Sequence, residues 1–80
     1  MTTLERTQEI LGANVRLIRH GKAISQEDFA ELVGISKVSV ATIEAGKGNL
    51  RLETLVKLAE AAGIEPAHLL VHHGDDWLID

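Results

Sequence analysis

The chain has 80 residues, enough for one small domain and too few for a catalytic domain joined to a sensor domain. It is 45% hydrophobic and 25% charged, so it can fold, and its only aromatic residues, Phe29 and Trp77, predict an aliphatic core of packed helices. The absence of cysteine excludes disulfides and thiolate metal sites and fits a reducing compartment.

The formal net charge of −4 counts against a simple nucleic-acid-binding protein, which is expected to be basic. The acidic residues are unevenly spread, however. Residues 1–24 hold four Lys or Arg and two Glu, whereas residues 48–80 hold two Lys or Arg and six Asp or Glu. Much of the acid therefore lies in the C-terminal half and need not face DNA, although non-specific DNA binding is expected to be weak.

The sequence predicts a cytoplasmic protein with no membrane contact. No apolar stretch approaches the roughly 20 residues that a membrane-spanning helix needs. The first ten residues carry Glu5 and Glu9, where a signal peptide would be basic and then apolar.

The first predicted helix covers about residues 4–20. Leu11, Val15 and Ile18 recur at helical spacing and therefore share one face. Gly21 is expected to end this helix, because glycine is common just past a helix C-terminus. Ile24 is expected to turn inward after it.

The segment QEDFAELVGISKVSVATIEA, residues 26–45, predicts two short helices that meet at a tight turn. Ser25 is a good N-cap for the first of them, and Asp28 stands close to a capping-box position. The small Ala30 fits where the two helices cross, and Gly34 tolerates the positive φ that the turn needs. The residues expected to point inward are Phe29, Leu32 and Val33. This pattern is a helix-turn-helix, which indicates DNA binding.

The second helix of this pattern begins after Ser36, runs to about Ala45 and stops at Gly46. Val40 and Ile43 are expected to face the core. The opposite side carries Lys37, Val38, Ala41 and Thr42. A loop over residues 47–51 is expected to follow.

A further helix is predicted over about residues 52–62, closed by Gly63, and Pro66 is expected to begin a fifth. The predicted buried positions are Leu55, Leu58, Ala59 and Ala62 in the former and Leu69 and Leu70 in the latter. The sequence therefore predicts one all-α domain of five helices over residues 1–80, with its core at about 10–70 and a C-terminal tail at 71–80.

Five segments, taken together, resemble those of the phage repressor/Cro-like helix-turn-helix regulators, also called the XRE type. They are VRLIR (15–19), ISQEDFAELVGIS (24–36), V-x-x-I-E-A-G-K (40–47), LETLVKLAEAAGI (52–64) and HLL (68–70). The resemblance covers about three quarters of the chain and keeps the spacing of the family. It implies a compact five-helix, lambda-repressor-like domain whose third helix enters the major groove of double-stranded DNA.

The resemblance also implies which residues contact DNA: Gln26, Ser36, Lys37, Val38, Ser39, Thr42, Lys47, Asn49 and Arg51. Within this set, Lys37, Val38 and Thr42 occupy base-reading positions, whereas Gln26 and the three loop residues match phosphate contacts. The family often has glutamine at the base-reading positions, and this sequence does not, so its operator does not follow from the resemblance. An ion pair between Arg19 and Glu44 is implied as a structural feature.

The chemistry of these residues agrees with the implied roles. Lys37 can donate to guanine O6 or N7, and Val38 can pack on a thymine methyl group. Each position also has a simpler explanation: Lys37 and Lys47 as solvated lysines, and Ser39 and Thr42 as partners of local backbone groups. DNA shape is a further source of discrimination where direct hydrogen bonds are few.

Two features lie outside this motif. His68 and His72 stand four residues apart, which suits a metal ion on a helix, but a polar, partly exposed helix face explains them better, and we expect no metal and no cofactor. The apolar residues near the C-terminus either fold back on the domain or are buried against a second subunit. The sequence favours burial against a second subunit. This predicted homodimerisation element comprises Leu70, Trp77, Leu78 and Ile79.

The sequence therefore favours a sequence-specific DNA-binding transcriptional regulator of bacterial or phage origin, most simply a repressor. As a homodimer it would bind a pseudo-palindromic operator. The alternatives are the antitoxin of a toxin–antitoxin pair, a restriction–modification controller that touches polymerase, and a protein-interaction module that has lost DNA binding. An enzyme is not expected, because no nucleophile–base pair, paired acid or phosphate-binding glycine loop is present.

Overall fold

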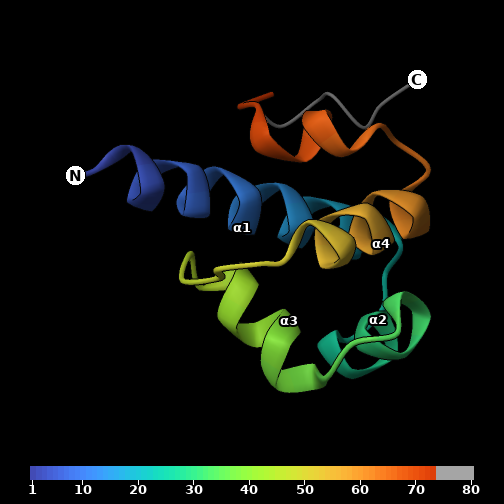
Figure 1. Cartoon of the computed structure of the whole chain (residues 1–80). Coiled ribbons are helices and arrows are strands. Elements are labelled where there is room, and N and C mark those ends of the chain that lie inside the picture. The colour runs from blue at the N-terminus through green and yellow to red at the C-terminus, as the bar shows by residue number, and fades with distance from the viewer. Residues whose placement is uncertain (74–80) are drawn as a thin grey trace.

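The computed structural model describes residues 1–73, and all regular elements in this range are helices. Four α-helices follow one another: α1 (Thr3–Gly21), α2 (Gln26–Val33), α3 (Lys37–Glu44) and α4 (Leu52–Ala62). A short 3-10 helix, η1 (Pro66–Leu70), comes last (Figure 1). The predicted all-α class is confirmed, but the fifth element is a 3-10 helix and not an α-helix. Trp77, Leu78 and Ile79 of the predicted dimerisation element lie outside the described residues.

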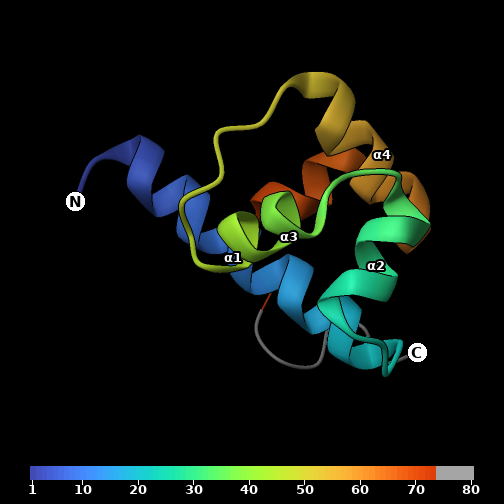
Figure 2. The same cartoon turned by 90° about the horizontal axis from the view of Figure 1, so that it is seen from below.

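Helix α1 is the longest element, and the others are arranged around it. In Figure 1, η1 runs along one side of α1, and α2 and α3 lie on the other side, while the view in Figure 2 shows α3 crossing α1. The side chains that this arrangement buries form one core: Leu11, Val15, Ile18, Phe29, Ala30, Val33, Val40, Ile43, Leu58, Ala59 and Leu69. None of the helices within residues 1–73 is long and apolar enough to cross a membrane.

Polar caps fix the ends of α2 and α3, as the sequence predicts. The backbone N–H of Asp28 donates to Ser25 Oγ (3.0 Å), and that of Ser39 donates to Ser36 Oγ (3.0 Å). Gly34 has φ +86° between the two helices, a left-handed conformation that glycine adopts without steric cost. Gly34 and the Ser36 cap set the turn of the helix-turn-helix, and the Ser25 cap begins its first helix.

The two ends of α1 differ from the prediction. A capping box between Thr2 and Glu5, which the sequence analysis did not identify, begins the helix at Thr3. At the other end, Gly21 is the last residue of the helix and does not stop it. The left-handed residue is Ala23, with φ +56°.

Two residues expected in the core are exposed. Leu32 is 55% exposed, because eight-residue α2 packs through the stripe of Phe29, Ala30 and Val33 alone. Leu70 is 37% exposed, since a 3-10 helix turns by about 120° per residue and points it away from the direction of buried Leu69.

Helices α1 and α3 meet at backbone distance at Gly12. A Cβ atom added there would lie 2.3 Å from the Ile43 carbonyl oxygen and 3.2 Å from that of Glu44. No side chain fits in this space, so the close crossing depends on glycine.

A buried amide attaches η1 to α1. Asn14 Nδ2 donates to the carbonyl oxygens of Leu69 and Val71, both at 2.9 Å. These carbonyls end the 3-10 helix, and Asn14 is 3% exposed. Its bonds therefore hold the C-terminal end of the core.

We expect Asn14→Ala to lower the free energy of unfolding by about 1–3 kcal/mol, because it removes the Asn14 donor from the buried Leu69 carbonyl. Chemical denaturation followed by circular dichroism measures this. Arg6→Ala, an exposed change on the same helix, is the control. Equal stability of the two variants would contradict a structural role for Asn14.

Candidate nucleic-acid interface

Helix α3 presents one face to the core and the opposite face to solvent. Val40 and Ile43 are buried, whereas Lys37, Val38 and Thr42 are exposed. Val38 is 75% exposed at the N-terminal end of the helix. An apolar side chain that the core does not use is available for contact with a ligand.

The two serines predicted to contact DNA form the N-terminal cap of α3. Besides accepting the Ser39 N–H, Ser36 Oγ donates to Ser39 Oγ at 2.9 Å. Both hydroxyls therefore stabilise the helix end, which is the local role considered for Ser39 in the sequence analysis. A contact with DNA would have to be made in addition to these bonds.

The loop after α3 places three predicted residues at the surface. Lys47, Asn49 and Arg51 are exposed, and Gly48 between them is buried. Asn49 shares a shallow hollow of about 190 Å³ with Val38 and Thr42. The fold therefore brings these residues of α3 and the loop together. Lys37, Lys47 and Arg51 do not line this hollow.

An ion pair joins the end of α1 to the end of α3. Arg19 Nε lies 2.7 Å from Glu44 Oε2, and a second guanidinium nitrogen lies 3.0 Å from Oε1. The same guanidinium donates to the Ile24 carbonyl at 3.0 Å. The Glu44 side chain is only 3% exposed, so this two-pronged pairing supplies the partner that a buried carboxylate needs.

Two more residues, Gln26 and Arg16, bind Glu44. Gln26 Nε2 donates to Glu44 Oε1 at 3.2 Å, which ties the start of α2 to the pair. Arg16 donates to the Glu44 carbonyl at 3.0 Å. Gln26, predicted as a phosphate contact, thus also has a structural partner. Sequence reasoning missed Arg16, although its spacing of three from Arg19 puts both on one face of α1.

The pKa of Glu44 is set by opposing effects. Burial raises it, but hydrogen bonds from Arg19 and Gln26 and the positive charges of Arg19 and Arg16 together hold the pKa below its ordinary value of 4.5. The ionised carboxylate therefore contributes stability that is fully present above the unfolded pKa. This stability is lost as the pH falls through the lower folded pKa.

We expect Glu44→Gln to lower the free energy of unfolding at pH 7 by about 3–5 kcal/mol, because it leaves the Arg19 charge without its partner. The loss of stability between pH 7 and pH 3 should also be smaller than in the unmodified protein. Urea denaturation at several pH values measures both effects.

The control is Glu53→Gln, which removes an exposed ion pair with Lys57 at 3.5 Å. Its cost should be at most about 1 kcal/mol. A pH dependence in Glu44→Gln as steep as that of the unmodified protein would rule out the assigned role of Glu44.

The histidines near the C-terminal end of the described residues are not part of a cluster of potential metal ligands. The rings of His68 and His73 meet edge to face, with centroids 5.9 Å apart, and a ring nitrogen of His73 contacts the His68 carbonyl. Within residues 1–73, no three histidine or acidic side chains are placed to hold a metal ion.

Two short helices joined at Gly34, the second with an exposed N-terminal face, define a helix-turn-helix domain. A family model described as helix-turn-helix matches residues 15–69, more than half of the chain. The chain therefore belongs to the helix-turn-helix family, in its XRE-type class of DNA-binding transcription regulators. This family comprises DNA-binding regulators and not enzymes.

Similar proteins include controllers from bacteria. Control protein C.SmaI of Serratia marcescens is 36% identical over 67 residues, which are 84% of this chain and 80% of the relative. The restriction-modification controller protein C.AhdI of Aeromonas hydrophila, known from a crystal structure, is 37% identical in sequence to this chain. Its structure matches with a TM-score of 0.71, over 78% of this chain and 94% of that one. The hypothetical transcription factor NHTF from Neisseria has a TM-score of 0.78 at 29% identity, over 90% and 83% of the two chains.

Proposed function

We propose that the protein is a sequence-specific transcriptional regulator that binds an inverted-repeat operator as a homodimer, with α3 in the major groove. The observation that carries this proposal is the face of α3 formed by Lys37, Val38 and Thr42, which is exposed. The opposite face of the helix is buried through Val40, Ile43 and Glu44. The short α2 and its turn hold the exposed face outward. A recognition helix needs this presentation to reach base edges.

The side chains of this face suit a mixed readout of bases. Lys37 donates hydrogen bonds to guanine acceptors, and Val38 packs against the thymine methyl group. Thr42 lies one turn beyond Val38 and shares a hollow with Asn49, so both reach the same part of the groove. The α3 N-terminus adds the positive end of its dipole toward the phosphate backbone.

The proposed phosphate contacts flank this face. Lys47, Asn49 and Arg51 follow α3 on an exposed loop, and Gln26 begins α2. With a net charge of −4, few cations displace counterions, so one subunit would bind weakly. Two subunits acting together on one operator offset this weakness.

The proposed dimer uses the C-terminal end of the chain. Leu70 and Val71 are exposed there, and the apolar Trp77, Leu78 and Ile79 follow in the sequence. A twofold arrangement places the two recognition helices about 34 Å apart, one turn of DNA. In its simplest form the dimer represses by occupying a promoter, and its own concentration controls occupancy.

A second candidate function, control of a restriction–modification system, is favoured by the similarity to C.SmaI and C.AhdI. Such a controller can activate transcription if an acidic surface touches polymerase. Glu27, Asp28 and Glu31 of α2 are exposed beside the recognition helix and provide that surface. The same similarity favours a controller over an antitoxin with a basic toxin partner.

The proposal is tested by repeated selection from a random pool of double-stranded DNA at two salt concentrations. We expect enrichment of an inverted repeat with half-sites about one helical turn apart. Affinity should fall steeply as salt rises. No enrichment, with weak binding that salt does not change, would instead favour a protein-interaction module without DNA binding.

The residue assignment within α3 is tested by substitution. Lys37→Ala and Thr42→Ala should each weaken binding to the selected operator by about 1–3 kcal/mol, because each removes a base contact. Their circular dichroism spectra and melting temperatures should stay near those of the unmodified protein. Arg19→Ala, which breaks the buried ion pair, should instead lower the melting temperature. If these outcomes are exchanged, the assignment is wrong.

A further inference from the structure

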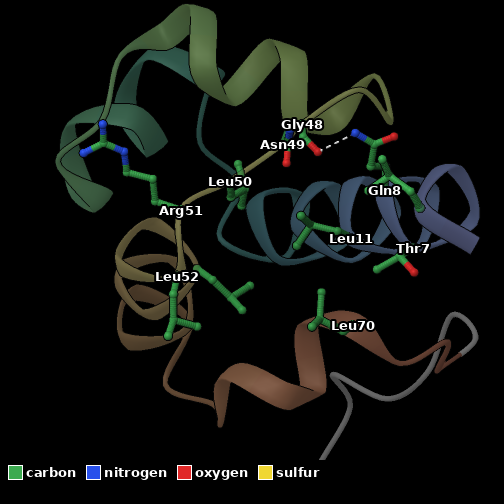
Figure 3. A pocket seen from close by; sticks show the side chains of 11 residues that line it. Thr7, Gln8, Leu11, Gly48, Asn49, Leu50, Arg51, Leu52 and Leu70 are labelled. Atoms are coloured by element: carbon green, nitrogen blue, oxygen red, sulfur yellow. Dashed lines mark hydrogen bonds between the residues drawn. The ribbon is translucent and has the colours of Figure 1, made fainter.

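The loop that carries the proposed phosphate contacts is held by the N-terminal half of α1, ahead of the residues that the family model matches. Gln8 Nε2 donates to the carbonyl oxygen of Gly48 at 2.9 Å, the dashed line in Figure 3. These residues are 40 positions apart in the sequence. The Gln8 side chain lies at the edge of a mainly apolar groove of about 280 Å³ that also contains Leu11 and Leu70.

Gly48 is fixed from its other side as well. It is buried, and a Cβ atom added to it would lie 2.9 Å from Ile43 Cγ1 and 3.2 Å from Ile43 Cα. The backbone at Gly48 therefore rests directly on the last turn of α3. The Gln8 bond and the Ile43 contact together determine the position of this peptide.

The regular hydrogen bonds of the loop stop short of Gly48. Before it, the Lys47 N–H donates to the Thr42 carbonyl at 3.1 Å, and after it, the Arg51 carbonyl accepts from the Thr54 N–H at 3.0 Å. Within residues 1–73, the Gln8 bond is the hydrogen bond that attaches the stretch between these points to another element. Losing it would leave Gly48, Asn49 and Leu50 without such an attachment.

We propose that Gln8 is a positioning residue for DNA binding: by holding the Gly48 carbonyl, it orients the neighbouring side chains of Lys47 and Asn49 toward the DNA backbone. This inference rests on the proposed function. Both residues are exposed and are the chain neighbours of Gly48, which the Gln8 bond and the Ile43 contact hold in place, so the directions of their side chains depend on it. A loop already held in its bound conformation does not have to be ordered when DNA binds.

The Gln8 bond should affect DNA affinity more than stability. The bond is only part-buried, so water can replace the donor at the carbonyl in the free protein. On DNA, by contrast, a loop without this bond must be ordered against the phosphates. The consequence is a specific signature: weaker binding and a smaller salt dependence with little change in melting temperature.

The test substitution is Gln8→Met, which keeps the length and helix propensity of the side chain, adds no charge and removes the donor. Its matched control is Thr7→Ala, because Thr7 lines the same groove but its hydroxyl bonds within α1, to the Thr3 carbonyl at 2.8 Å. Binding to the operator obtained by selection is measured by fluorescence anisotropy at several salt concentrations. Hydrogen exchange reports the loop amides, and a second variant, Gln8→Ala, repeats the test with a smaller side chain.

We expect Gln8→Met to bind the operator about threefold to tenfold more weakly than the unmodified protein, the range that one lost hydrogen bond gives. The slope of log affinity against log salt should fall by about one, as for a lost phosphate contact. Exchange of the Lys47 amide, whose hydrogen bond to the Thr42 carbonyl borders this stretch, should become faster. The melting temperature should stay near that of Thr7→Ala.

Equal affinity and salt slope in the unmodified protein and both Gln8 variants would overturn the role of Gln8 and leave the proposed function standing. A fall in melting temperature that accounts for the whole loss of binding would also overturn it, by showing a purely structural bond. If the unmodified protein itself has no salt-dependent DNA affinity, the proposed function fails, and the role of Gln8 in DNA binding fails with it.

Discussion

The buried pair of Arg19 and Glu44 is the interaction on which the arrangement of the helices depends. A carboxylate with a side chain only 3% exposed is costly unless it is paired, and here it binds the guanidinium of α1 and the amide of Gln26 at the start of α2. One acidic side chain at the end of α3 therefore connects three helices. Because the ligands come from different elements, none of the three can shift without separating a charge from its partner.

Such a connection is needed because the helices of the motif are short. Helices α2 and α3 have eight residues each, a length at which an isolated helix is not stable in water. Their caps at Ser25 and Ser36 satisfy free amides at the start of each helix, and the turn at Gly34 sets the angle between them. Core packing and the pair of Glu44 with Arg19 then hold α3 in place, with its exposed face toward solvent.

Most of the fold follows from local sequence signals, because capping, helix-ending glycines and apolar spacing act over a few residues. Ser25, Ser36 and Gly63 mark helix ends where they were expected. The misses have long-range or geometric causes. The burial of Leu32 depends on which neighbour covers α2, and the bonds of Asn14 and Gln8 join residues more than 35 positions apart, so no local pattern reveals them. For the site, the sequence indicates exposed residues on α3 and its loop, but not that Gln26 already has a partner, Glu44, within the protein.

The close crossing at Gly12 has a consequence for how such a protein would read DNA. The backbones of α1 and α3 touch there without intervening side chains, so α3 cannot tilt or slide on the rest of the domain. If α3 enters the major groove, as we propose, the DNA must adjust its own twist and groove width to this fixed helix. Base steps that deform easily would then be preferred even at positions that no side chain reaches. The flexibility of the operator DNA would thus contribute to sequence specificity, in addition to direct base contacts.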